Sequence, residues 1–219
     1  MIKAVIFDFD GVLVESSEIK TRAFQMLFND YPNMVDNIVK YHIDNMGVSR
    51  YVKFRYIYTN FLKLELTPEK EAELGRKFSE IVLDEIIKAP FVPGVMDFLD
   101  SSRKKYLFFI ASGTPEEELK QIVNRRNIES FFLEVFGTPK TKAEIIKSIL
   151  EKHAINQNEA VFVGDAATDQ MAAEETGVPF IGRITSENHT LFQNYKWTIK
   201  DFNQLSNLLT LIENSQKDN

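Results

Sequence analysis

Short apolar runs that stop at Gly, Asp or Ser recur along this chain and constrain its fold more than any other feature. They are rich in Val, Ile and Phe, as strands covered on both faces of a sheet are. The runs are Ala4–Phe7, Tyr106–Ala111, Phe132–Phe136, Ala160–Val163 and Val178–Ile181. Helical patterns separate the later runs, over Glu116–Asn124, Lys142–Lys152 and Thr168–Thr176. Strand–helix alternation with short connections predicts an α/β fold with a parallel sheet.

The segment from residue 16 to residue 89 breaks this alternation, because it has helical periodicity and no strand pattern. An aromatic stripe, expected to pack in a core, falls on one helix face at Tyr51, Phe54, Tyr58 and Phe61. A second helix is expected over 68–88, with Thr67 as its cap. Two prolines and a glycine then end it. We therefore predict a helical domain over 16–89, inserted into an α/β domain formed by 1–15 and 90–219.

Composition excludes several classes of protein. With 26 Lys and Arg against 32 Asp and Glu, the net charge is −6, which argues against a general nucleic-acid or anionic-membrane binder. The chain has no Cys, so disulfides, thiolate metal sites and a cysteine nucleophile are impossible. No apolar run approaches the roughly 18 residues of a membrane helix. We expect a cytoplasmic protein with no membrane or nucleic-acid partner.

Polar residues follow four of the predicted strands. They are Asp8 and Asp10 after the first, Ser112, Gly113 and Thr114 after the second, Lys140 and Lys142 after the third, and Asp165 and Asp169 after the fourth. Ligands of open α/β sheets bind outside the carboxyl ends of the strands, so we expect these side chains to converge.

The converging residue types indicate phosphoryl transfer. Asp8 and Asp10 would repel each other unless a cation lies between them, and an all-oxygen ligand set that includes Asp165 favours Mg²⁺. A carboxylate can act as a nucleophile toward phosphorus, and a second one can move the proton of the leaving group or of water. Ser112, expected at a helix start, and a lysine after the third strand would bind the phosphoryl group.

Together these motifs resemble those of the haloacid dehalogenase superfamily. The resemblance implies a Rossmann-like parallel sheet with an inserted α-helical cap, and it implies Asp8 as nucleophile and Asp10 as general acid and base. Ser112 matches the second motif, with Gly113 and Thr114 as substrate contacts. Lys142 fits the third motif best, and Lys140 is the alternative. The fourth motif implies Asp165 as a metal ligand and Asp169 behind it, with Asp8 binding Mg²⁺ through its side chain and Asp10 through its main-chain oxygen.

The resemblance also narrows the reaction. Dehalogenases of the family lack the second Asp, so Asp10 implies a phosphatase or phosphomutase. The sequence around Gly47 and Arg50 resembles the substrate loop of β-phosphoglucomutase, which makes Arg50 a candidate substrate-binding residue. Two differences weaken the mutase interpretation, because Met46 replaces a Lys of that loop and Lys20 replaces a His.

We therefore predict a Mg²⁺-dependent phosphatase that hydrolyses a small phosphomonoester, such as a sugar phosphate, through an aspartyl-phosphate. The alternatives are a β-phosphoglucomutase-like isomerase and a non-catalytic protein that binds a phosphorylated metabolite. The partner is a small phosphorylated metabolite, and the protein is a monomer or homodimer. Three histidines, His42, His153 and His189, lack the spacing of metal ligands and are interpreted as structural, with His42 the one nearest a candidate site residue.

Overall fold

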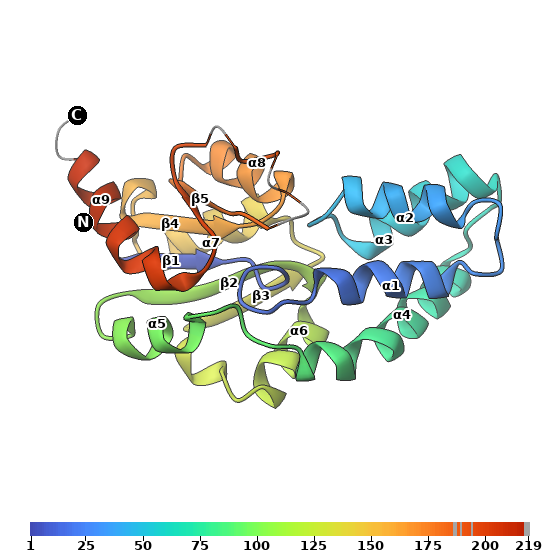
Figure 1. The fold of residues 1–219 in the computed structure, drawn as a ribbon, viewed down its shortest axis with the longest axis horizontal. Helices are drawn as coiled ribbons and strands as arrows, with labels where there is room; N and C mark the ends of the chain where they lie inside the picture. Colours follow the sequence, from blue (N-terminus) through green and yellow to red (C-terminus); the bar gives the residue numbers. More distant parts are fainter. Residues whose placement is uncertain (186–187, 189, 194, 217–219) are drawn as a thin grey trace.

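The computed structural model describes residues 1–185, 188, 190–193 and 195–216, and His189 lies outside them. Its centre is a parallel sheet with the strand order β3-β2-β1-β4-β5-β6 (Figure 1). The strands are β1 (Ala4–Phe7), β2 (Leu107–Pro115), β3 (Glu134–Thr138), β4 (Ala160–Gly164), β5 (Phe180–Arg183) and β6 (Thr198–Ile199). The chain therefore has the predicted α/β fold, with β1 at the middle of the sheet between β2 and β4.

Helices cover both faces of this sheet. Those of one face are α5 (Val95–Ser102), α6 (Glu116–Arg125) and α9 (Leu205–Ser215), and those of the other are α7 (Lys142–Lys152) and α8 (Ala167–Thr176). Residues of β1 alternate between two hydrophobic cores, Val5 and Phe7 in the first and Ala4 and Ile6 in the second. Because successive side chains of a strand point to opposite faces, a continuous apolar run serves both layers.

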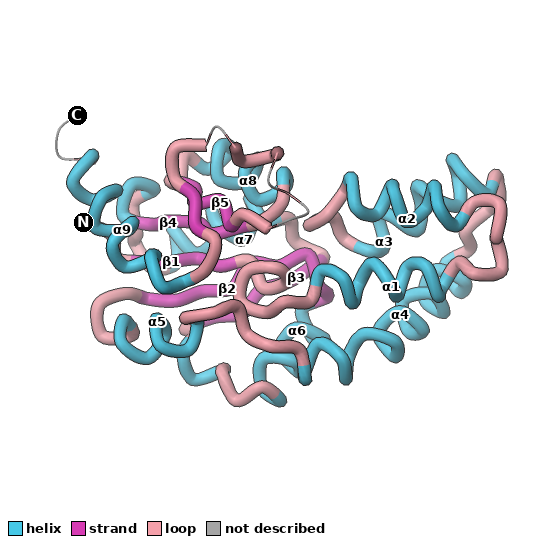
Figure 2. The backbone as a smooth tube through the Cα atoms, in the orientation of Figure 1, coloured by secondary structure: helices cyan, strands magenta, loops and turns pink. Residues whose placement is uncertain are grey.

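Four further helices extend beyond the carboxyl end of the sheet, and we call them the cap helices (Figure 2). They are α1 (Ser17–Leu27), α2 (Val35–Asp44), α3 (Arg50–Ile57) and α4 (Pro68–Lys88). Thr67 caps α4 as predicted, because its hydroxyl accepts a hydrogen bond from the Lys70 amide at 3.3 Å. The domain boundaries predicted from the sequence stay a prediction.

The aromatic stripe spans two elements rather than one regular helix. After α3 the chain forms a π-helical turn, Tyr58–Leu62, so Tyr58 and Phe61 continue the stripe on a wider helix. Phe54 and Tyr58 are buried in the first core, and Tyr51 and Phe61 pack against it. The stripe packs in the core of the cap helices, as the sequence predicts.

Two expectations differ from the structure. The sequence predicts Ser112 at a helix start, but it lies inside β2, four residues before α6 begins. The run that predicts this strand ends at Ala111, whereas β2 continues past an irregularity in its pairing with β3. The second difference is β6, which is two residues long and too short to leave a periodic pattern. None of the helices in the described part of the chain has the length and apolar character that a membrane span requires.

Candidate active site

Three buried carboxylates meet at the carboxyl end of the sheet. Asp8 directly follows β1, Asp165 directly follows β4, and Asp169 lies in the first turn of α8. One carboxylate oxygen from each lies within 4.8 Å of the other two, and all three side chains are buried. Asp169 also fixes the turn before α8, since its Oδ2 accepts hydrogen bonds from the main-chain amides of Asp165 and Ala166 at 3.2 and 3.0 Å. The parallel strands thus bring together residues that are 157 positions apart.

Lys142 contacts this cluster and Lys140 does not. A capping box between Thr141 and Glu144 fixes the start of α7, so Lys142 is its first residue. From there its Nζ lies 2.9 Å from Asp8 Oδ2 and also donates to Asp169 Oδ1. Lys140 is exposed, with its ammonium over the Phe136 ring. Of the two candidate lysines, the structure places only Lys142 beside Asp8.

The cluster carries more negative charge than Lys142 offsets. Burial raises the pKa of Asp8 to about 7, with Lys142 opposing the shift and Asp169 and Asp10 adding to it. Burial, together with Asp8 and Asp169, also raises the pKa of Asp165. The pKa of Lys142 is raised, because the two carboxylates outweigh the effect of its burial. A compact set of carboxylate oxygens with surplus negative charge fits a hard divalent cation such as Mg²⁺.

A narrow turn lets the first strand approach this cluster. Gly11 has φ = +71°, and a Cβ at that position would lie 2.0 Å from Asp165 Oδ2. The turn after Asp10 therefore requires a glycine.

The carboxylate of Asp10 has hydrogen-bond partners of its own, separate from the cluster of three carboxylates. Its Oδ2 accepts hydrogen bonds from Lys20 Nζ at 2.5 Å and Thr114 Oγ1 at 2.9 Å, and its Oδ1 accepts one from Ser16 at 2.7 Å. Burial raises the pKa of Asp10, but Lys20 and these hydrogen bonds outweigh it and the net pKa is lowered. The sequence marks Lys20 only as a difference from the mutase, whereas in the structure its ammonium contacts the Asp10 carboxylate.

Ser112 and Gly113 lie where the sheet meets the cap helices. Ser112 is buried, and its Oγ accepts a hydrogen bond from the Thr114 amide at 3.2 Å. The backbone of Gly113 lies so close to the loop between α2 and α3 that a Cβ at this position would be 2.6 Å from the Gly47 carbonyl oxygen. We call this contact the glycine seam. It allows the loop of the cap helices to pack directly against the second motif.

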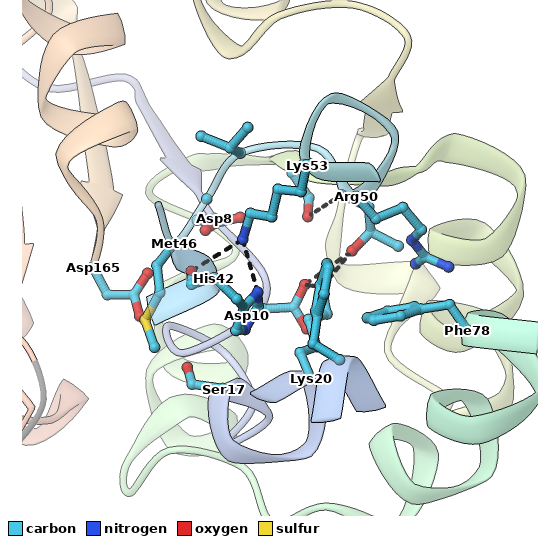
Figure 3. Close-up of a pocket in the computed structure, with 16 residues that line it drawn as sticks. Asp8, Asp10, Ser17, Lys20, His42, Met46, Arg50, Lys53, Phe78 and Asp165 are labelled. Carbon is cyan, nitrogen blue, oxygen red and sulfur yellow. Dashed lines mark hydrogen bonds and ion pairs between the residues drawn. The ribbon is translucent and has the colours of Figure 1, made fainter. Parts of the chain in front are cut away.

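One cavity contacts both the sheet and the cap helices (Figure 3). Its lining from the sheet side includes Asp8, Asp10, Ser112, Gly113, Thr114 and Asp165. Its lining from the cap helices includes Lys20, Phe24, His42, Gly47, Arg50 and Lys53. The structure therefore brings the candidate residues of all four motifs to this cavity or, for Lys142 and Asp169, to a carboxylate next to it.

Arg50 lines the cavity, but its guanidinium already binds a carboxylate. Its two terminal nitrogens lie 2.5 and 3.0 Å from the carboxylate oxygens of Glu118, which belongs to α6. It also donates to Ser79 at 2.9 Å and lies over the Phe78 ring. Arg50 thus links α3 to α6, a helix that packs on the sheet, and its contact with substrate stays a prediction.

Lys53 and His42 are two buried residues of the cavity that the sequence analysis did not assign to the site. Lys53 Nζ lies 2.9 Å from His42 Nδ1 (Figure 3). The spacing of residues on α3 could have indicated this. The buried residues of α3 are spaced as one face of a helix, and they are Arg50, Lys53, Phe54 and Ile57. Two cations at core positions of one helix are unusual and would have pointed to this wall of the cavity.

The comparison with protein families agrees with this arrangement. A model of the haloacid dehalogenase-like hydrolases matches residues 5–183, which include all four motifs. The chain belongs to this family. The match takes in the first strand from its second residue onward, the helical segment that follows and the next four strands.

Relatives of known name are similar over most of their length. A phosphoglycolate phosphatase from Aliivibrio fischeri is 24% identical over 199 residues, which cover 86% of each chain. A phosphorylated carbohydrates phosphatase from Thermotoga maritima is 26% identical over 196 residues, or 87% of each chain.

Solved structures with the same fold include two of similar size. A β-phosphoglucomutase from Clostridium difficile has a TM-score of 0.80 at 17% identity and full coverage of both chains. A predicted phosphoglycolate phosphatase from Haemophilus somnus has a TM-score of 0.76 at 19% identity, covering 95% of this chain and 98% of that one. At these identities the likeness concerns the fold.

Proposed function

We propose that this protein is a Mg²⁺-dependent phosphatase that hydrolyses a small phosphomonoester through a phosphorylated Asp8. The observation that carries the proposal is the contact between Asp8 and Lys142 beside a cavity that Asp10 and Ser112 also line. Phosphoryl transfer depends on positioning and on neutralising charge, and these residues supply both. The two relatives named as phosphatases support the same reaction class.

The first step would transfer the phosphoryl group to the protein. A carboxylate oxygen of Asp8 forms a bond to phosphorus while the bond from phosphorus to the ester oxygen breaks. Asp10 is ionised in the free protein, because its pKa is lowered, so it would take up a proton as the substrate binds and pass that proton to the leaving oxygen, and an alcohol departs. Lys142 and the Ser112 hydroxyl would hold the negative oxygens of the phosphoryl group.

The second step would release phosphate and restore Asp8. Asp10 takes a proton from a water molecule, whose oxygen attacks phosphorus as the bond to Asp8 breaks. Lys20 and Thr114 hold Asp10 in place for both proton transfers, because both donate to its Oδ2. The cap helices would limit the entry of other water molecules.

Mg²⁺ would be held by the carboxylates of Asp8 and Asp165 and by the main-chain oxygen of Asp10, with Asp169 behind them. When bound, it supplies positive charge that reduces the repulsion between the Asp8 carboxylate and the phosphate oxygens.

The test is a panel of phosphomonoesters incubated with the purified protein and Mg²⁺, scored for free phosphate and for isomerised sugar phosphate. Phosphate release that EDTA stops and added Mg²⁺ restores is the expected result. Conversion of β-glucose 1-phosphate to glucose 6-phosphate with little free phosphate would replace the phosphatase by a mutase. Binding without turnover of any substrate would leave the non-catalytic alternative.

A further inference from the structure

Lys53 is a buried ammonium with no carboxylate partner among the residues that the structure describes. It is 2% exposed, and it lines the cavity that also contacts Asp8. Its Nζ lies 2.9 Å from the ring Nδ1 of His42 and 3.3 Å from the main-chain oxygen of the same residue. Removing a charged group from water without a counterion costs several kcal/mol. A buried ammonium without a counterion in a ligand cavity indicates that the ligand itself supplies the anion.

The aromatic ring of Phe24 fixes both residues of the pair. The His42 ring stacks on it with centroids 4.3 Å apart, and the Lys53 ammonium lies 5.4 Å from its centroid. These contacts bring side chains from α2 and α3 together over a residue of α1. The pair is therefore held by packing of three cap helices rather than by a flexible loop.

The hydrogen bonds of the pair leave donors for a ligand. An ammonium can only donate, so His42 Nδ1 accepts and the neutral ring carries its proton on Nε2. The two contacts with His42 use two of the three ammonium hydrogens, so one remains. Burial, with Lys53 and Lys20 nearby, lowers the pKa of His42 to about 2, which keeps its ring neutral.

The surrounding charge favours one further anion. Burial, with Lys20 and Lys142 nearby, lowers the pKa of Lys53 to about 7. Both neighbouring lysines already bind carboxylates, Lys20 that of Asp10 and Lys142 those of Asp8 and Asp169. Arg50, three residues before Lys53 on α3, is likewise paired with Glu118. Among these described cations of the cavity region, Lys53 alone has no anionic partner.

We propose that Lys53, positioned by His42, binds a carboxylate of the substrate while the phosphate of the same molecule lies at Asp8. The proposal deepens the proposed function and rests on it. It names the substrate class as short phosphomonoesters of hydroxy acids, because one cavity contacts both residues. A carboxylate suits the site better than a second phosphate, since one lysine offers a single positive charge and few donors.

The test compares three substrates that differ only at the end away from the phosphate ester. They are 2-phosphoglycolate with a carboxylate, 2-hydroxyethyl phosphate with a neutral hydroxyl, and ethanediol bisphosphate with a second phosphate. For the wild-type protein with Mg²⁺, we expect kcat/KM for 2-phosphoglycolate to exceed that for 2-hydroxyethyl phosphate by at least about tenfold, as one charge-assisted hydrogen bond supplies.

Lys53→Met keeps the length and apolar stem of the side chain but removes the charge. We expect the ratio of the two kcat/KM values to fall to within about twofold of one, chiefly through a higher KM for 2-phosphoglycolate. Lys40→Met, at an exposed position of α2, is the matched control and should keep the wild-type ratio. Lys53→Gln, a polar replacement with the same expected ratio, serves if the methionine variant does not fold.

The outcomes separate the two proposals. An unchanged ratio in the Lys53 variants, equal rates of the wild-type protein on the acid and the neutral ester, or a preference for the bisphosphate would overturn carboxylate recognition and leave the phosphatase standing. Failure of the wild-type protein to release phosphate from any of the three esters and from the wider panel would overturn the proposed function itself, and this inference with it.

Discussion

Two buried lysines beside one cavity have opposite electrostatic surroundings. Lys142, from the helix after β3, is 7% exposed and contacts Asp8 and Asp169, and its pKa is raised. Lys53, from the cap helices, is 2% exposed, its hydrogen bonds in the described part of the chain go to His42, and its pKa is lowered to about 7. Burial opposes the charge of both, so the difference comes from the carboxylates. At the carboxyl end of the sheet the buried lysine is paired with carboxylates, whereas on the cap wall it has no carboxylate partner among the residues that the structure describes.

The largest expected effect comes from the sheet side of this comparison. Asp8→Asn keeps the size of the side chain but removes the nucleophile and one partner of Lys142. We expect phosphate release from the best substrate of the panel to fall by at least about a thousandfold. Asp44→Asn, an exposed carboxylate of α2, should retain full activity. Retention of more than a tenth of wild-type activity by the Asp8 variant would contradict the nucleophile assignment.

Replacing Lys142 tests whether the lysine that contacts Asp8 and Asp169 is needed for the reaction. Lys142→Ala should lower kcat by about a hundredfold or more, because it removes a buried donor beside the phosphoryl group. Lys140→Ala removes an exposed charge two residues away and should change kcat by less than about threefold. Steady-state kinetics on both variants decides between them, and the opposite order would give the phosphate-binding role to Lys140.

Arg50 provides a comparison with Lys53 inside the cap helices, because it is a buried cation that is paired with a carboxylate. Arg50→Met removes the cation from Glu118, whose side chain is 9% exposed and keeps the hydrogen bond from the Ser79 hydroxyl, and we expect urea unfolding to show a loss of about 3 kcal/mol. Adding Glu118→Gln to that variant should recover part of the loss. Arg22→Met removes a half-exposed ion pair with Glu85 and should cost under about 1 kcal/mol. Equal losses of unfolding free energy in the two arginine variants would show that the Arg50 ion pair stabilises the protein no more than an exposed one.

The smallest expected effect concerns the pH dependence of stability. The pKa of His42 is lowered to about 2 in the folded protein, so between that value and 6.5 the unfolded chain binds more protons at this residue. Its contribution to stability is therefore complete above pH 6.5 and decreases as the pH falls. His42→Gln cannot gain this proton. Between pH 6 and 5, the wild-type protein should lose up to about 1.4 kcal/mol more per pH unit than the variant. Parallel stability profiles from urea unfolding would contradict the neutral state of His42.

The carboxyl end of the sheet was predictable because its residues follow strands that have a clear pattern. Once β1 and β4 are recognised, parallel topology brings Asp8 and Asp165 to the same end, whatever the sequence between them. The fit to the third family motif likewise favoured Lys142 over Lys140. Ser112 was placed less well, because an irregular strand continues beyond its apolar run.

The cap wall was less predictable because its contacts depend on how helices pack against one another. The pairing of Lys53 with His42 joins two helices over Phe24, and that of Arg50 with Glu118 joins residues 68 positions apart. Helical periodicity indicates which residues share a face, but it does not say which helix covers that face. The spacing of Arg50 and Lys53 therefore indicates that both are buried, but it does not identify the residues that they contact.

The glycine seam determines how closely the loop between α2 and α3 can approach β2. Because the carbonyl of Gly47 occupies the place where a side chain at position 113 would begin, a single methyl group there would act as a spacer between the two halves of the cavity. Under the two proposals above, one substrate would contact Asp8 on one wall and Lys53 on the other. The close packing at Gly113 would therefore help to set the length of substrate that fits between the two walls.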